Sequence, residues 1–427
     1  MTAGSGRRVR VVFVNRFYAP DHSATSVMLG GIARSLADGD FDVTVVTSRQ
    51  LYEEPVTRLA RRETLDGVDV IRVPGTRFGR RRLAGRAADY LSFYLSTFFA
   101  LLVLLRPGTI VVAKTDPPLI ALVCAPAAWL RRARLVNWLQ DVFPEVATAL
   151  GAAPIPGVLA RALVALRDAV CRRAATNVVL GDRMRDFLLR RGVPEGRLVV
   201  IPNWADGALI VPCPTDGSRL RNGQGLAGKF VVAYCGNLGR AHDYTTLLTA
   251  ARLLQPVDEV RFLIVGGGAG MEALRLAAQE LALSSIRFVS YQPAAELADT
   301  LAAADVHLVC LRPELEGLIV PSKLYGILAA GRPAVFWGDR DGEIARELRR
   351  TGAGLSVASG DGAALAAAIE SLRSDPVRRA AISRAARTAY VERYTREMAV
   401  ARWQELLAAA GADSPIRHAP YGNLQRR

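Results

Sequence analysis

The strongest constraint on the fold is an alternation between short apolar runs and stretches of helical periodicity, which occurs twice along the chain. The first half has apolar runs at residues 8–15, 41–47, 67–74, 109–114, 133–139, 177–180 and 197–201. The second half has them at 229–234, 260–265, 286–289, 306–311, 333–337 and 354–357. Continuous apolar runs that alternate with helices are typical of parallel sheets covered by helices on both faces. The sequence therefore predicts an α/β protein with two tandem Rossmann-like domains.

The segment Pro202-Asn203-Trp204 interrupts this alternation and marks the expected domain boundary. We predict an N-terminal domain over residues 1–203 and a C-terminal domain over 204–388. Residues 411–427 have no periodicity and are predicted to form a mobile tail. Open α/β sheets bind ligands beyond the carboxyl ends of their strands. The ligand site is therefore expected in a cleft between the two domains.

The positive charge of the chain is concentrated in its first half. The first 205 residues contain 29 Lys and Arg against 17 Asp and Glu, whereas the remainder contains 26 against 23. A basic half suits either nucleic acid or an anionic membrane leaflet. The sequence shows no RNA-binding or helix-turn-helix signature, which argues against nucleic acid as a partner.

One basic cluster is followed at once by an uncharged apolar run. The cluster consists of Arg77, Arg80, Arg81, Arg82 and Arg86, and the run covers the 16 residues Tyr90–Leu105. A membrane-crossing helix needs about 20 apolar residues, so this run is expected to dip into a membrane or lie flat on it. A buried core helix is the alternative. Because nucleic-acid sites interleave aromatic residues with their charges, we interpret Arg77–Leu105 as a membrane-surface segment.

The cysteines and the N-terminus indicate the compartment. The five cysteines are scattered without the spacing of metal ligands, which favours reduced thiols and no metal site. Residues 1–6 are polar, and the apolar run at 9–14 is too short for a signal peptide and lacks a cleavage site. We therefore expect a cytoplasmic protein that associates peripherally with the inner face of the plasma membrane.

Two glycine-rich loops follow apolar runs of the second domain. Gly236-Asn237-Leu238-Gly239-Arg240 comes after the run at 229–234, and Arg240 could pair with a diphosphate through two hydrogen bonds. Gly266–Gly270, including Gly267, lies between a predicted strand and a helix, as phosphate-binding loops do. Met271 stands where a dinucleotide fingerprint needs glycine, which argues against hydride transfer. Ordinary turns, with a solvated arginine in the first, remain the alternatives.

The most specific local signal is the segment 314–324, in which Glu314 and Glu316 precede Ser322, Lys323 and Leu324. Ser322 is expected to cap the following helix, and Lys323 would add positive charge at the helix start. A capped helix with exposed glutamates is the alternative. In the first domain, Asp141 follows the run at 133–139 and should face the cleft, unless it only caps a helix.

Seven short segments together match a known family pattern: Phe17–Pro20, Thr115–Pro118, Gln140–Glu145, Ile201–Trp204, Gly236–Gly239, Val320–Tyr325 and Gly331–Pro333. With these segments, nearly the whole chain resembles glycosyltransferase family 4, especially the branch that assembles colanic acid, O-antigen and other cell-surface polysaccharides. This resemblance implies a GT-B fold with a cleft between the domains, retention of anomeric configuration, no metal or other cofactor, and a nucleotide-sugar donor held mainly by the second domain.

The resemblance also implies roles for individual residues. Arg240 and Lys323 would bind the donor diphosphate, Glu316 the transferred sugar, and Tyr291 would flank the base. Further donor contacts would come from Gly236, Asn237, Gly267, Ser322 and Leu324. Asp141, together with the loop residues His22 and Ser23, would face the acceptor. A final helix over 389–407 would return to the first domain.

Two positions depart from the family pattern. Gly326 stands where the family has a glutamate that holds the ribose, and His242 stands near the usual diphosphate-binding lysine. Glu343 is our candidate to replace the missing glutamate.

These features together predict a retaining glycosyltransferase that moves a sugar from a nucleotide-sugar, UDP-linked, to a polyprenyl-linked saccharide, with Asp141, Glu316 and Lys323 as the catalytic residues. A sugar-nucleotide epimerase of the same architecture and a catalytically idle partner subunit are the alternatives.

Overall fold

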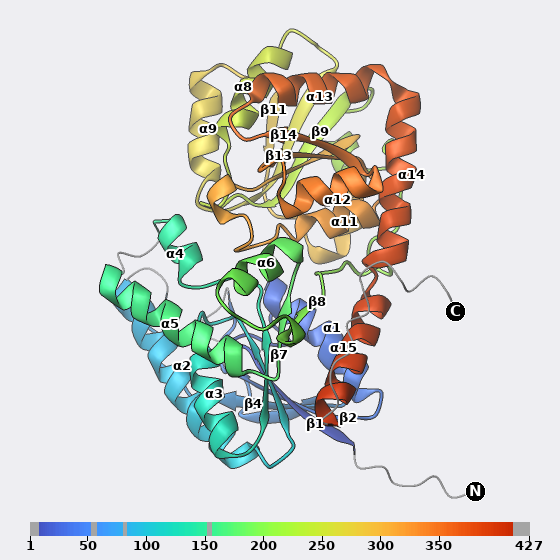
Figure 1. Ribbon diagram of the computed structural model, residues 1–427. Helices are drawn as coiled ribbons and strands as arrows, with labels where there is room; N and C mark the ends of the chain where they lie inside the picture. The colour runs from blue at the N-terminus through green and yellow to red at the C-terminus, as the bar shows by residue number, and fades with distance from the viewer. Residues whose placement is uncertain (1–7, 53–57, 80–82, 152–155, 413–427) are drawn as a thin grey trace, which may run out of the picture. The chain divides into compact units, whose positions relative to one another are not determined.

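The computed structural model describes residues 8–52, 58–79, 83–151 and 156–412. The chain forms two compact units: Met1–Ile201 with Ala399–Arg427, and Pro202–Met398. Each unit is built on one twisted sheet with helices on its faces (Figure 1). The tail predicted over 411–427 lies, from residue 413 onward, outside the described residues.

Unit 1 contains an eight-stranded sheet in the order β3-β4-β2-β1-β5-β6-β7-β8. The strands are β1 (Val9–Val14), β2 (Phe41–Ser48), β3 (Arg62–Leu65), β4 (Val68–Val73), β5 (Ile110–Lys114), β6 (Arg134–Trp138), β7 (Thr176–Val179) and β8 (Leu198–Val200). All neighbours pair in parallel except β3, which runs antiparallel to β4. The strand order reverses direction between β1 and β5, and ligands bind at such switch points.

Strand β3 is absent from the sequence-based prediction because its side chains lie on an edge and are exposed or half-exposed. It joins β4 through a two-residue turn in which Asp66 and Gly67 both have positive φ, 49° and 75°. Such turns match the twist of antiparallel strands. The polar strand therefore depends on its turn and its partner strand rather than on burial.

The helices of unit 1 are α1 (Ala24–Ala37), α2 (Leu83–Leu104), α3 (Ala121–Leu130), α4 (Glu145–Ala149), α5 (Gly157–Arg173), α6 (Asp182–Arg190) and α15 (Arg396–Gly411). Helix α2 packs against α3, and α3 packs against α5. These three helices form one layer over the sheet (Figure 1). Helix α2 has 22 residues, so it begins well before the apolar run at 90–105 and is longer than that run predicts. Arg80, Arg81 and Arg82 of the predicted basic cluster lie outside the described residues.

The end of the chain differs from the predicted single helix over 389–407. Two helices cover this range instead: α14 (Pro376–Arg393) ends at Arg393, and α15 begins at Arg396. Thr395 separates them, because its hydroxyl accepts a hydrogen bond from the Met398 N–H, 3.3 Å away, as N-cap residues do. Within unit 1, Trp403 of α15 is fully buried against Phe13 and Trp138, at ring-centroid distances of 6.3 and 4.7 Å.

Unit 2 contains a six-stranded, wholly parallel sheet in the order β11-β10-β9-β12-β13-β14. The strands are β9 (Phe230–Asn237), β10 (Val260–Gly267), β11 (Ile286–Val289), β12 (Val306–Cys310), β13 (Ala334–Gly338) and β14 (Gly354–Ala358). The main helices are α8 (Thr245–Leu254), α9 (Met271–Glu280), α10 (Leu297–Ala302), α11 (Lys323–Ala329), α12 (Glu343–Thr351), α13 (Gly362–Ser374) and α14. This order reverses between β9 and β12, which is the second switch point.

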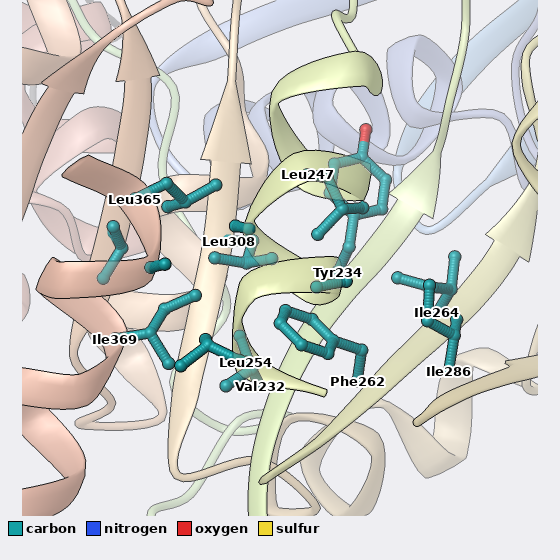
Figure 2. Packing of buried hydrophobic residues seen from close by; sticks show 14 of the residues in the cluster. Val232, Tyr234, Leu247, Leu254, Phe262, Ile264, Ile286, Leu308, Leu365 and Ile369 are labelled. Carbon is teal, nitrogen blue, oxygen red and sulfur yellow. The ribbon is translucent and has the colours of Figure 1, made fainter. Parts of the chain in front are cut away.

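The core of unit 2 lies between this sheet and the helices on its faces. Figure 2 shows Leu247 and Leu254 of α8 and Ile369 of α13 packed beside strand residues such as Phe262 and Leu308. The strands are buried on both faces, which is why they read as continuous apolar runs in the sequence.

Candidate functional site

The two glycine loops of unit 2 pack against each other at the carboxyl ends of β9 and β10. Gly266 lies opposite Gly236 in the sheet register, and both have positive φ, 129° and 118°. A methyl group on Gly266 would lie 2.3 Å from the Gly236 carbonyl oxygen, and one on Gly268 would lie 2.2 Å from Asn237 Oδ1. The Leu238 N–H also donates to the Gly267 carbonyl at 2.7 Å. Only glycine fits these positions, so the loops form a rigid shelf of exposed backbone.

Lys323, the first residue of α11, brings a buried positive charge to this shelf. Its Nζ has no hydrogen-bond partner among the described residues and lies 3.4 Å from the centroid of the Tyr234 ring. A side chain on Gly236 would come within 4.0 Å of the same Nζ. Burial lowers the pKa of Lys323 to about 8, an effect that the Cys310 and Cys235 thiols oppose. A buried ammonium without a partner is costly, and an anion on the shelf would satisfy it.

The expected capping role of Ser322 is wrong. Ser322 occupies the N-cap position of α11, but its backbone is helical, with φ −67° and ψ −18°, and its side chain makes no capping hydrogen bond. Leu324 is 1% exposed, so its side chain belongs to the core, and a donor contact at this residue would have to come from its backbone. The positive charge at this place therefore comes from the Lys323 side chain rather than from a capped helix end.

His242 and Arg240 complete the shelf. His242 Nδ1 accepts a hydrogen bond from the Gly239 N–H at 3.0 Å. Burial, followed by the nearby charge of Lys323, lowers the pKa of His242 to about 4, so its ring is neutral at pH 7. Arg240 is exposed, and its guanidinium makes no hydrogen bond or ion pair within the described part of the chain. Lys323 and Arg240 are therefore two cations at this edge that pair with no carboxylate among the described residues.

The structure brings together Glu316 and Glu343, which the sequence places 27 residues apart. Glu316 Oε1 accepts a hydrogen bond of 2.8 Å from the Glu343 N–H, at the first turn of α12. A methyl group on the preceding Gly342 would lie 2.4 Å from Glu316 Oε2. A carboxylate at a helix N-terminus is stabilised by the exposed backbone N–H groups. Glu316 is thus held in one position beside the start of α12.

Two further positions named by the sequence analysis are Tyr291, whose ring lies over the shelf, and Gly326, which lies in α11. The Tyr291 ring is 58% exposed and covers Gly267, where a methyl group would lie 2.9 Å from Cε2 of the tyrosine. A methyl group on Gly326 would contact Ile210 and Leu301, each at 3.7 Å. These are ordinary van der Waals distances, so packing alone does not exclude a larger residue at this position.

In unit 1, three charged residues lie at the carboxyl ends of β5 and β6: Lys114, Asp116 and Asp141. Lys114 is fully buried, its Nζ lacks a hydrogen-bond partner among the described residues, and it lies 3.5 Å from the centroid of the Trp138 ring. Burial lowers the pKa of Lys114 to about 7, which Asp116 and Asp141 oppose. Burial, and next the Asp116 charge, raise the pKa of Asp141 to about 6. The sequence prediction names Asp141 but misses Lys114, whose one signal is a lysine that ends a continuous apolar strand.

The predicted acceptor-side residues lie between β1 and α1. His22 is exposed, and the Ser23 N–H donates to Asp21 Oδ1 at 2.8 Å. Two residues further, the Thr25 hydroxyl lies 3.4 Å from Asp116 Oδ2, in the loop after β5. The start of α1 and the loop after β5 therefore meet at the switch point of unit 1, which is the expected place for a ligand.

Comparison with known proteins is consistent with this arrangement. Family models match residues 23–204 (Glycosyl transferase 4-like domain) and 229–375 (Glycosyl transferases group 1). WbjE of Pseudomonas aeruginosa, named as a probable glycosyltransferase, is 31% identical over 268 residues, 62% of this chain and 66% of WbjE. WcaI of Escherichia coli K12, named for colanic acid biosynthesis, is 29% identical over 277 residues, again 62% of this chain and 66% of the relative. The chain therefore matches just under two thirds of the length of each relative.

Among solved structures, HepE of Anabaena in complex with UDP and glucose has a TM-score of 0.70 at 18% identity, covering 94% of this chain and 100% of HepE. Two Rossmann-like sheets, each with polar groups at its switch point, define the GT-B class of fold. The chain belongs to glycosyltransferase family 4. Since both matching models are glycosyltransferase models, nothing supports the epimerase alternative.

Proposed function

We propose that the protein is a retaining glycosyltransferase that moves a sugar from a UDP-linked donor to a polyprenyl-linked saccharide during cell-surface polysaccharide assembly. The observation that carries this proposal is the buried Nζ of Lys323 beside the glycine shelf of unit 2, which has no hydrogen-bond partner in the described part of the chain. The solved HepE complex contains UDP and glucose, and the name of WcaI assigns that relative to colanic acid biosynthesis, which supports this choice of donor and process.

In the proposed reaction, unit 2 stabilises the leaving group. The shelf N–H groups, Lys323 and Arg240 bind the diphosphate and offset the negative charge that develops as the glycosidic bond breaks. Because these cations neutralise the diphosphate, the proposal needs no metal. Glu316, held at the start of α12, orients the transferred sugar through its hydroxyl groups.

Unit 1 prepares the acceptor in this proposal. Asp141, with a pKa of about 6, is ionised at neutral pH and can accept a proton from the attacking hydroxyl. The hydroxyl attacks from the face that the diphosphate leaves, assisted by the departing phosphate oxygen, and this gives retention of configuration. His22 and Ser23 are placed to contact the acceptor.

We also propose a peripheral position at the inner face of the plasma membrane. Helix α2 is long and apolar enough to cross a membrane by length and composition. However, Phe93, Thr97 and Leu101 on one of its faces are buried in unit 1. Leaving the unit would expose this core face, so α2 is expected to rest on the membrane with its other face.

Ligand-dependent thermal stability tests the proposed donor site. UDP, GDP, ADP, NAD and single-stranded DNA are compared at millimolar concentration, for the wild type and for Arg240→Ala. A ligand at 100 times its Kd adds about 2.7 kcal/mol of stability, and we expect UDP to give the largest effect and Arg240→Ala to reduce it. Arg252→Ala, which removes an exposed arginine of α8, is the matched control. Stabilisation by NAD or DNA alone would overturn the proposal.

Glu343 is expected to take the ribose-binding role that Gly326 cannot fill. Glu343→Ala should weaken UDP binding about tenfold, the effect of losing one hydrogen bond to a charged group. The variant keeps the Glu343 backbone N–H, which donates to Glu316, so the position of Glu316 should not change. Titration calorimetry with UDP measures this change, and Glu347→Ala on the same helix is the control. Equal UDP affinity in Glu343→Ala and the wild type would remove Glu343 from the site.

A further inference from the structure

The segment that carries Asp141 is short and is held at both of its ends. It runs from Asp141 to Glu145, between the end of β6 and the start of α4. On the side of the sheet, the N–H of the preceding residue donates to the Thr115 hydroxyl oxygen at 2.8 Å. On the other side, the Phe143 carbonyl and the Glu145 carboxylate both accept hydrogen bonds from Arg167 of α5. The position of Asp141 therefore depends on a helix as well as on the strand that precedes it.

The guanidinium of Arg167 makes directional contacts with this segment. Arg167 is 5% exposed, its Nη1 lies 3.3 Å from the Phe143 carbonyl oxygen, and its Nη2 lies 2.5 Å from Glu145 Oε1. A guanidinium is planar and its donors form a rigid fork, so two acceptors that bind it are also fixed relative to each other. Hydrogen bonds from an ionised donor are among the strong ones. The two bonds together leave the segment 141–145 little freedom to move.

Arg167 is itself held in place by α6. Its Nε donates to Asp168 Oδ1 at 2.8 Å, and Asp168 Oδ2 accepts from Arg191 Nε at 2.9 Å. Arg191 follows the last residue of α6, and the Phe187 ring of the same helix lies 6.0 Å from the guanidinium carbon of Arg167. Two arginines thus pair with two carboxylates. The guanidinium of Arg167 is engaged with protein groups, and its role is to connect α4, α5 and α6.

Arg167 and Asp141 line the same small cavity. The cavity has a volume of about 30 Å³, and Val142 and Phe143 also line it. One water molecule needs about 10–15 Å³ of such volume, so there is little free space behind Asp141. A displacement of the segment at Phe143 and Glu145 would therefore also displace the Asp141 carboxylate.

Stability alone does not require this arrangement. Apolar residues of similar volume can often replace a buried ion pair without loss of stability. An apolar contact between α5 and the segment 141–145 could hold unit 1 together equally well. What an apolar contact lacks is direction, and direction is what the fork of Arg167 supplies.

We propose that Arg167 is a positioning residue that fixes the segment 141–145 and thereby orients the Asp141 carboxylate toward the acceptor hydroxyl. The inference rests on the proposed function, in which Asp141 is the general base. A general base acts within hydrogen-bond reach of the proton that it removes, and a displacement of about 1 Å can cost on the order of 10²-fold in rate. The charges that shift the pKa of Asp141 are those of Asp116 and Lys114, so Arg167 acts through geometry.

A double-mutant cycle tests this role. Turnover at saturating donor and acceptor is measured for the wild type, Arg167→Met, Asp141→Asn and the double variant. We expect Arg167→Met to lower kcat about 10²-fold in the wild-type background and to have no further effect in the Asp141→Asn background, because residues that act as one unit are not additive. The KM for the donor should not change. The acid limb of the pH–rate profile, expected near pH 6, should also stay in place.

Two further variants separate positioning from folding. Arg167→Lys keeps the positive charge but not the fork, so it should lose less turnover than Arg167→Met. Arg221→Met removes a buried arginine that pairs with Asp305 at 3.0 Å in unit 2, and as the control it should keep the wild-type kcat. Thermal stabilisation by UDP shows that each variant is folded. If Arg167→Met does not fold, Arg167→Lys is taken through the same cycle.

The remaining outcomes count against the inference. Equal losses from the Arg167 variant in both backgrounds would assign Arg167 a structural role only, and a wild-type kcat in Arg167→Met would remove any role. The same loss in Arg221→Met would trace the effect to the absence of any buried ion pair. Full activity of Asp141→Asn would overturn the proposed function together with the inference, so the Asp141→Asn variant distinguishes the two failures.

Discussion

Replacing Lys323 by methionine is expected to lower glycosyl transfer by about 10²-fold or more and, at the same time, to stabilise the protein. The loss follows from removing a cation that offsets leaving-group charge. The gain follows because the Lys323 ammonium is buried without a hydrogen-bond partner among the described residues, and its pKa falls from 10.5 to about 8. That difference corresponds to up to about 3 kcal/mol against folding below pH 8.

The pH dependence of this stabilisation is fixed by the same pKa values. Between pH 8 and 10.5 the unfolded chain binds more protons than the folded one, so the wild type becomes more stable as pH rises. The advantage of Lys323→Met should therefore be largest below pH 8 and disappear near pH 10.5. Urea unfolding at pH 7 and pH 10 measures it, with Lys229→Met as an ion-paired control. A destabilised variant with normal turnover would assign Lys323 a structural role only.

Replacing Asp141 by asparagine is expected to lower turnover by about 10²- to 10⁴-fold, the range for loss of a general base. In the wild type, turnover should fall as pH drops through about 6, where Asp141 becomes protonated. The positive charge of Lys114 lowers the pKa of Asp141, so Lys114→Met should move this acid limb to higher pH. This movement would identify Lys114 as a positioning residue.

The measurement is turnover as a function of pH, at saturating donor and acceptor, for the wild type, Asp141→Asn and Lys114→Met. Asp182→Asn, an exposed carboxylate at the start of α6, serves as the control. If the acid limb of Lys114→Met lies at the same pH as that of the wild type, Lys114 does not influence the general base Asp141. Full activity of Asp141→Asn across the pH range would remove Asp141 from the mechanism.

Most strands of both sheets could be predicted from the sequence because they are buried on both faces and appear as unbroken apolar runs. The exception, β3, is an exposed edge strand that exists through its turn and its partner, β4. Helix α2 could be predicted as a helix, but its surroundings could not be predicted from the sequence. Its exposed and buried faces are both apolar, so composition could not separate the membrane-surface interpretation from the core interpretation; the structure gives it one buried and one exposed face.

The site residues also differ in whether local sequence or tertiary neighbours determine them. The glycine loops at 236–240 and 266–270 could be found because a positive φ and close backbone contact leave only glycine, and that requirement is local. The expected cap at Ser322 is wrong, and the Leu324 side chain is buried, because side-chain direction and burial depend on the neighbours of α11. The contact between Glu316 and the start of α12 joins segments that are distant in sequence.

The two α/β units, the position of their loops and the family could be predicted from periodicity and local backbone requirements alone. The three-dimensional arrangement was needed to show that Lys114 and Lys323 are buried beside aromatic rings, that Arg49, Arg58 and Arg77 line one pocket, and that α2 exposes an apolar strip. This is because strand order sets which loops meet. Burial and charge pairing arise from those meetings, and a linear pattern does not contain them.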